Sequence, residues 1–267
     1  MKSRKTAVTA MVCGVLIGVL LSTAWADGLT DARGRGRLRA GVKTDFAPFG
    51  YEAPSGEILG FDADLARGLA KALFDDESAL ELVPVTSGSR IPLLYSDLID
   101  LIIASMTVTE DRRRVLDFSK PYFITGSLLL TLKGSPIRGV EDLAGRQVAV
   151  VAGAVQEKDL PIIAPEARLV AFENLPAALH ALRSKNVEAV CQDDITLLSE
   201  AQVDANLTIV GKPFLPRPYA IAVRKGESKF LAWIDAHLEK MKRDGTLQML
   251  RRKYFMDMEA ELMPLPE

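Results

Sequence analysis

The feature of this sequence that most restricts its fold is a regular alternation of short apolar runs with amphipathic stretches. Runs rich in Val, Ile and Leu, such as "RLRAGV" and "DLIIAS", are followed by segments whose apolar residues recur at helical spacing. The clearest helix is predicted over residues 61–74, where Phe61, Leu65, Leu69 and Leu73 recur every four residues. Strands that alternate with helices favour parallel sheets covered on both faces, so the sequence predicts an α/β protein.

The alternation occurs twice along the chain. A segment interrupted by Gly and Pro, residues 126–145, separates the first series from a second one over residues 146–210. One more strand is then predicted over 219–226, and two closing helices over 230–243 and 246–255. With 267 residues the chain is long enough for two domains of ordinary size, so two α/β units are the natural prediction.

The N-terminus differs in composition from the rest of the chain. Residues 1–5 contain three basic side chains, an apolar run then reaches Leu21, and Ala24, Trp25 and Ala26 follow. This order predicts a secretory signal peptide, residues 1–26, cleaved after Ala26. A retained anchor is the alternative, but about 16 apolar residues fall short of the roughly 20 needed to span a bilayer. A lipoprotein would use Cys13, which lacks a small preceding residue.

Charge and cysteine content exclude several classes of function. Without residues 1–26 the chain has 30 basic and 35 acidic residues, a net charge of −5, which argues against a nucleic-acid ligand. Cys191 alone remains of the cysteines, so no internal disulfide is expected. His180 and His237 lie far apart within helical patterns, so we predict neither a metal site nor a cofactor.

The residues that follow the predicted strands are the candidates for binding, because open α/β sheets bind ligands beyond the carboxyl ends of their strands. Three strand ends carry suitable groups. The first offers hydroxyls and then Arg112, the second the backbone N–H groups of residues 152–156, and the third Asp193. A guanidinium and a carboxylate from different units would match the two poles of a zwitterion.

Each of these residues also has a purely structural interpretation. Thr109 and Asp193 could be helix caps, and residues 112–114, three successive arginines at the start of a predicted helix, could be solvated. An arginine at a helix start is unfavourable beside the backbone dipole. A bound anion would account for Arg112, whereas Arg113 and Arg114 are expected to face water.

Several segments together resemble the family-3 solute-binding proteins that deliver polar amino acids to ABC importers. They include "LRAGVKTDFAPFGYEAPSGEILGFDADLARGLAKAL", "DLIIASMTVTEDRRRVLDFSKPYF", "EDLAGRQVAVVAGAVQEKD", "VEAVCQDD" and "KRDGTLQMLRRKYF". The resemblance implies the two-lobe periplasmic-binding-protein fold of type II, with a mostly parallel sheet in each lobe. It implies lobe 1 over residues 27–128 plus 219–267, lobe 2 over 129–218, and a two-strand hinge at "GSLLLTLKG" and "PRPYAIAVRKG".

The resemblance also implies roles for individual residues. Arg112 would grip the ligand α-carboxylate with Ser105 and Thr107 beside it, Asp193 would take the α-ammonium, and Phe46 would cover the ligand side chain. The full set of expected ligand-binding residues is Phe46, Ala104, Ser105, Met106, Thr107, Arg112, Val151, Val155, Gln156 and Asp193. Residues 153–155 read Gly-Ala-Val where many relatives have hydroxyl side chains, and Ala104 replaces a serine of some relatives. The resemblance therefore implies a pocket less polar than that of a typical binder of basic amino acids.

The same resemblance implies a function, with one alternative. We expect a periplasmic, monomeric carrier that delivers a small amino acid to an ABC permease and ATPase in the inner membrane. Cyclohexadienyl dehydratases share this fold, but their N-P-G-G-T-N-E stretch reads "VAGAVQE" here, which leaves Glu157 as the nearest acid for proton donation. The segment after "RRKYF" reads "MDMEAELMPLPE", which does not predict the membrane span of a receptor. We therefore expect a binding protein and no enzyme.

Overall fold

The fold consists of two five-stranded sheets that share the same pattern of strands, in a computed structural model whose described residues are 27–256. The predicted signal peptide lies outside these residues. The first sheet has the order β5-β1-β6-β13-β7 (Leu80–Pro84, Leu38–Val42, Leu101–Ile102, Ala222–Arg224, Leu116–Phe118). The second has the order β10-β9-β11-β8-β12 (Arg168–Phe172, Gln147–Val151, Ala189–Asp193, Phe123–Leu132, Leu207–Tyr219). A small antiparallel sheet is formed by β2 (Asp45–Phe46), β3 (Gly50–Glu52) and β4 (Ile58–Leu59).

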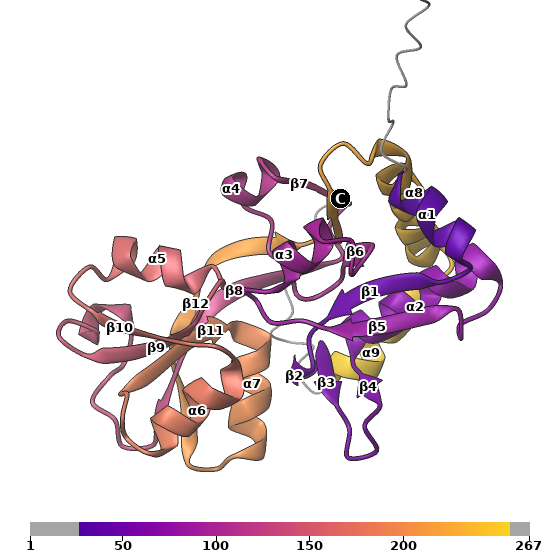
Figure 1. Ribbon diagram of the computed structural model, residues 1–267. Helices are drawn as coiled ribbons and strands as arrows, with labels where there is room; N and C mark the ends of the chain where they lie inside the picture. Colours follow the sequence, from indigo (N-terminus) through magenta and orange to yellow (C-terminus); the bar gives the residue numbers. More distant parts are fainter. Residues whose placement is uncertain (1–26, 257–267) are drawn as a thin grey trace, which may run out of the picture.

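Helices flank both large sheets, and the two halves of the molecule lie side by side with β8 and β12 reaching between them (Figure 1). The first half carries α1 (Gly28–Arg35), α2 (Phe61–Phe74), α3 (Arg90–Tyr95), α4 (Glu110–Arg113), α8 (Ser228–Arg243) and α9 (Thr246–Phe255). The second half carries the 3-10 turn η1 (Val140–Asp142), α5 (Gln156–Ile163), α6 (Leu175–Arg183) and α7 (Asp194–Val203). Within residues 27–256, none of these helices has the length and apolar character that crossing a bilayer requires.

The expected α/β class is confirmed, with sheets that are mixed rather than mostly parallel. In the first sheet β1 pairs in parallel with β5 and β6, whereas β13 pairs antiparallel with β6 and β7. The second sheet repeats this arrangement, with β8 antiparallel to β11 and β12. Parallel neighbours need a crossover of a dozen or more residues. A strand that arrives directly from the other half, such as β13, is free to enter antiparallel.

The chain passes between the sheets twice, through residues 119–122 and 220–221. These connections lie side by side, because Phe123 of β8 pairs with Tyr219 of β12. The same end of β12 is tied to the first half by the Thr107–Tyr219 bridge and by the bond from Val108 N to Pro218 O, 2.9 Å long. Two neighbouring segments of the chain thus connect the two halves.

The helix predictions are confirmed where the apolar pattern is strong. Helix α2 covers Phe61–Phe74, and Phe61, Leu65 and Leu69 are completely buried. The arginine-rich segment differs from the prediction. It forms only the four-residue turn α4, because β7 begins at Leu116, so Arg112 lies in the last turn of the helix. Because the helix is a single turn, Arg112 lies in its first turn as well, and its N–H donates to the N-cap Thr109 Oγ1 at 3.2 Å.

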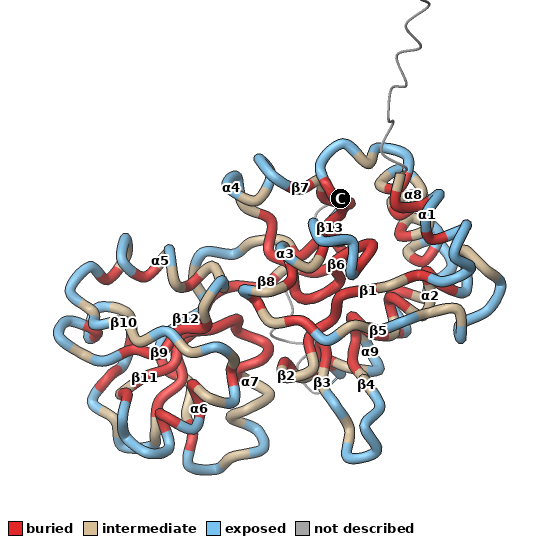
Figure 2. The backbone as a smooth tube through the Cα atoms, in the orientation of Figure 1, coloured by how far each residue is buried: buried red, intermediate tan, exposed pale blue. Residues whose placement is uncertain are grey.

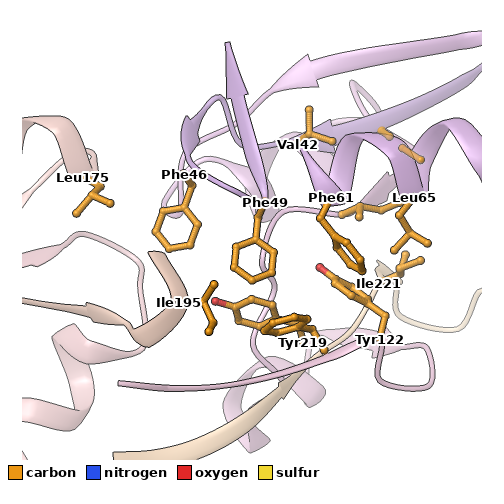
Figure 3. Packing of buried hydrophobic residues seen from close by; sticks show 14 of the residues in the cluster. Val42, Phe46, Phe49, Phe61, Leu65, Tyr122, Leu175, Ile195, Tyr219 and Ile221 are labelled. Carbon is orange, nitrogen blue, oxygen red and sulfur yellow. The ribbon is translucent and has the colours of Figure 1, made fainter. Parts of the chain in front are cut away.

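The buried residues follow the central strands of both sheets, and the exposed ones follow the loops and outer helix faces (Figure 2). Where the halves meet, a cluster of aromatic rings fills the space beside the crossing strands (Figure 3). Phe49 lies 4.9 Å from Phe123 and 5.3 Å from Tyr219 between ring centroids, both in edge-on arrangements. Aromatic pairs of this geometry add about 0.5–1.5 kcal/mol each beyond their burial. The cluster therefore holds Tyr219 in place beside the site described next.

Candidate ligand-binding site

One small cavity lies between the two halves, lined by residues from both. Its volume is about 10 Å³, room for about one water molecule. An amino acid is much larger, so binding one requires the halves or the lining side chains to move apart. The lining residues are Lys43, Phe46, Ser87, Arg90, Ser105 and Thr107 from the first half and Ala154, Val155, Gln156, Gln192 and Asp193 from the second.

The loop that follows β6 presents alternate side chains to the cavity. Ser105 and Thr107 line it, whereas Ala104 and Met106 point the other way and are buried in a hydrophobic cluster. Ser105 has a left-handed backbone with φ of 49°. Asp62, at the start of α2, accepts a hydrogen bond of 2.7 Å from the Ser105 N–H and fixes this conformation. Asp62 therefore positions the loop.

Arg112 lies at the edge of this cavity and joins the two halves. Its guanidinium donates to Thr107 O at 2.7 Å within its own half and to Gly153 O at 2.9 Å in the other. These bonds use two of the five N–H groups of the side chain. Desolvation and the nearby Arg90 lower the pKa of Arg112 to about 9, so it stays charged at neutral pH. Arg113 and Arg114 are exposed, as expected.

Asp193 faces the first half from the end of β11. It occupies the N-cap position of α7, but its side chain makes no capping hydrogen bond. Instead its carboxylate accepts from Gln156 Nε2 at 2.7 Å and from the Tyr219 hydroxyl. The side chain is buried, and desolvation raises its pKa. The carboxylate is thus held in the cavity wall by hydrogen bonds to its neighbours.

Some of the backbone N–H groups that were expected to bind the ligand after β9 already donate hydrogen bonds to other groups of the protein. Gly153 N donates to Glu157 Oε2 at 2.8 Å, and Ala154 N donates to Val151 O at 3.0 Å. Val151 itself is packed in the core away from the cavity. Val155 and Gln156 do line the cavity. Glu157 acts as a cap for this loop, which is a structural role.

Of the ten expected residues, the structure brings six to the cavity wall: Phe46, Ser105, Thr107, Val155, Gln156 and Asp193. Arg112 lies beside them, and Ala104, Met106 and Val151 are buried behind them. The prediction missed five lining residues: Lys43, Ser87, Arg90, Ala154 and Gln192. Lys43 directly follows β1, and Ser87 and Arg90 follow β5. The rule that was applied to three strand ends would have found them if it had been applied to every strand.

Comparison with known proteins agrees with the fold. Residues 38–257 match the profile of the bacterial extracellular solute-binding proteins, family 3. The ABC transporter glutamine-binding protein GlnH of Bacillus subtilis is 41% identical over 88% of this chain and 87% of its own length.

Solved structures resemble the whole fold. A variant of ArgBP from T. maritima has a TM-score of 0.81 and 32% identity, over 86% of this chain and 99% of its own. An ancestral amino acid-binding protein, described as a precursor of cyclohexadienyl dehydratase, has a TM-score of 0.79 and 33% identity, over 85% and 99%. The relatives are transport binding proteins, which favours a binding protein over the dehydratase alternative. The chain has the type II periplasmic-binding-protein fold and belongs to family 3 of the bacterial extracellular solute-binding proteins.

Proposed function

We propose that this protein captures a small amino acid between its two halves and delivers it to an ABC importer. The observation that carries the proposal is that Asp193 of the second half lines the cavity, while Arg112 of the first half bonds to Thr107, which also lines it, and to Gly153 of the second half. A guanidinium matches a carboxylate in a fork of two hydrogen bonds, and a carboxylate attracts an ammonium. An α-amino acid carries both groups on one carbon atom. The names of the relatives, which bind glutamine and other amino acids, support the same ligand class.

The ten residues expected from the sequence are proposed as ligand contacts or their immediate support. Arg112 would hold the α-carboxylate, Asp193 the α-ammonium, and Phe46 the ligand side chain. Residues 27–128 plus 219–267 are proposed as one lobe and 129–218 as the other, with closure of the cleft on binding. The smallness of the cavity supports this motion, because the ligand has to enter before the halves meet.

The proposed setting is the periplasm. Residues 1–26 would be removed after Ala26, and the monomeric carrier would dock on a permease and its ATPase in the inner membrane. The basic and apolar segments at the N-terminus support export.

A thermal-shift panel of the twenty amino acids on the full chain, repeated on Arg112→Ala and on Arg114→Ala, tests the proposal. We expect one or a few amino acids to raise the melting temperature of the wild-type protein. Removing one member of a buried charge pair typically costs about 2–5 kcal/mol, so Arg112→Ala should weaken binding by roughly tens to thousands of times. Arg114→Ala is the matched control, because that side chain is exposed, and it should bind as the wild type does. If no amino acid stabilises the wild-type protein, the proposed function is wrong.

A further inference from the structure

The cavity is lined by more positive charge than the two poles of an amino acid require. Lys43 and Arg90, which come from different loops of the first half, both line it, and each is only 2% exposed. Buried cations are costly unless a counter-charge or hydrogen-bond acceptors compensate them. Asp193 is the acid that lines the cavity with them. Arg112 adds a third cation at its edge.

Lys43 has weak compensation within the described part of the chain. Its Nζ atom lies 3.9 Å from Asp45 Oδ1 and 4.0 Å from the centre of the Phe46 ring, and it makes no hydrogen bond to another described residue. An ammonium has three donors, and a distance of 3.9 Å is too long for a hydrogen bond. The group is therefore buried with its hydrogen-bonding capacity unused.

Arg90 and Gln192 add further unused donors on the same cavity. Arg90 Nη1 donates to Ala104 O at 2.5 Å, but Arg90 Nε is buried without a partner among residues 27–256. The same holds for Gln192 Nε2. Against these donors stands the acceptor Gln156 Oε1, which also lacks a partner in that range. Among the residues that line the cavity, unpartnered donors thus outnumber unpartnered acceptors; Asp45 Oδ2 and Asp62 Oδ1, which also lack a partner in that range, belong to residues outside the lining.

The charged side chains around the cavity can be assigned in turn to parts of the ligand. A zwitterionic α-amino acid would use Arg112 and Asp193 and bring no net charge of its own. Asp62 does not line the cavity, and its Oδ2 atom accepts from the Ser105 N–H. Lys43 and Arg90 both line the cavity, and their charges repel each other. Burial lowers the pKa of Lys43 most, Arg90 lowers it further, and Asp45, Asp193 and Asp62 act to raise it. A neutral side chain leaves this repulsion in place, whereas an anionic one removes it.

We infer that the ligand carries an anionic side chain, and that it is a dicarboxylic amino acid whose distal carboxylate lies between Lys43 and Arg90. This inference rests on the proposed function, because it assigns the ligand backbone to Arg112 and Asp193. A carboxylate is the acceptor that the unused donors Lys43 Nζ, Arg90 Nε and Gln192 Nε2 can share. Arg90 Nη1 donates to the backbone carbonyls of residues 104 and 105, so the guanidinium is already oriented.

Isosteric pairs that differ only in charge give the test. Isothermal titration calorimetry on the full chain, dialysed from mild denaturant to remove carried-over ligand, compares L-glutamate with L-glutamine and L-aspartate with L-asparagine. In at least one pair we expect the acid to bind about ten times more tightly than the amide, or more. Lys43→Met keeps the length of the side chain without its charge. It should weaken binding of the preferred acid by about tenfold to a thousandfold and change binding of its amide by less than about threefold.

A matched control is Lys212→Met, because Lys212 is exposed in the second half. It should leave the preference for the acid unchanged. An amide, a neutral or a basic amino acid that binds at least as tightly as both acids overturns the inference and leaves the proposed function standing. If the Lys43→Met variant keeps the full preference for the acid over its amide, the assignment of the distal carboxylate to Lys43 is wrong. Failure of all twenty amino acids to bind removes the proposed function itself.

Discussion

The two sheets have the same pattern of strand pairing but opposite chemistry at their strand ends. Each begins with two parallel pairings and ends with two antiparallel ones. Around the cavity the first half places Lys43, Arg90 and Arg112, whereas the second places Asp193 and the amides of Gln156 and Gln192. The scaffold therefore determines where groups meet, and the loops determine which charge they carry.

This difference explains why neither half alone would complete a site for a dipolar molecule. Burial lowers the pKa values of Lys43 and Arg112, and repulsion from Arg90 lowers both further. The carboxylate of the second half has a raised pKa because it is desolvated. A ligand with charges of both signs compensates the buried cations of the first half and the buried carboxylate of the second half at once. Binding should therefore be coupled to contact between the halves.

The largest expected effect follows from neutralising the second half with Asp193→Asn. Loss of the charge that attracts the ammonium should weaken ligand binding by about 2–5 kcal/mol. The free energy of unfolding without ligand should stay the same or rise, because a costly buried carboxylate is removed. Calorimetry and urea unfolding measure the two quantities.

Asp204→Asn is the control for this change, because Asp204 lies at the end of α7 in an ion pair with Arg183, away from the cavity. It should not alter binding. If both variants lose the same affinity, the division of charge between the halves does not govern recognition.

An intermediate effect is expected where the halves touch. Gly153 has φ of 77°, and a Cβ added there would lie 2.8 Å from Gly88 Cα in the other half. Gly153→Ala should therefore hold the halves apart and weaken binding by about tenfold, roughly 1.4 kcal/mol. Gly145→Ala has a similar φ of 71° and open space around its Cβ, so it suffers the backbone strain without the clash. Equal binding by the two variants would mean that contact at residue 153 is not needed for the bound state.

The smallest effect concerns pH. Burial lowers the pKa of Lys43 from 10.5 to about 8; among the charges that surround it, Arg90 lowers this pKa further, whereas Asp45, Asp193 and Asp62 act to raise it. Between these two values the unfolded chain binds more protons at this group than the folded one, so its contribution to stability rises with pH. The affinity for a dicarboxylic acid should fall over the same range, because Lys43 loses its charge.

The ratio of acid to amide affinity, measured from pH 7 to pH 9.5, isolates this group, because both ligands share the same α-ammonium. We expect the ratio to fall by up to about tenfold. Lys43→Met should give a ratio that does not change with pH. A wild-type ratio that is equally flat would contradict the assignment of Lys43 to the ligand side chain.

Much of the fold could be predicted from the sequence, because the spacing of the apolar residues indicates the helices and strands. The bounds of α2 and the existence of α8 and α9 follow from residues such as Leu65 and Leu69 at helical spacing. The antiparallel entry of β8 and β13 could not be predicted in this way. It depends on the chain crossing between sheets, which leaves no local pattern.

The site was predicted in part, for two physical reasons. Strand ends correctly drew attention to Ser105, Thr107 and Asp193, but side chains alternate in direction, so Ala104 and Met106 face the core. Lys43 and Arg90 follow β1 and β5, two strand ends that were not considered, and a charged residue in a sequence is normally solvated. In the structure each of the two is only 2% exposed.

The most direct test of the account is a crystal structure with the amino acid that stabilises the protein most. The account predicts that the ligand lies between the halves, with its α-carboxylate on the Arg112 guanidinium and its ammonium on the Asp193 carboxylate. A ligand bound elsewhere, or bound in the cleft with both groups away from Arg112 and Asp193, would contradict it.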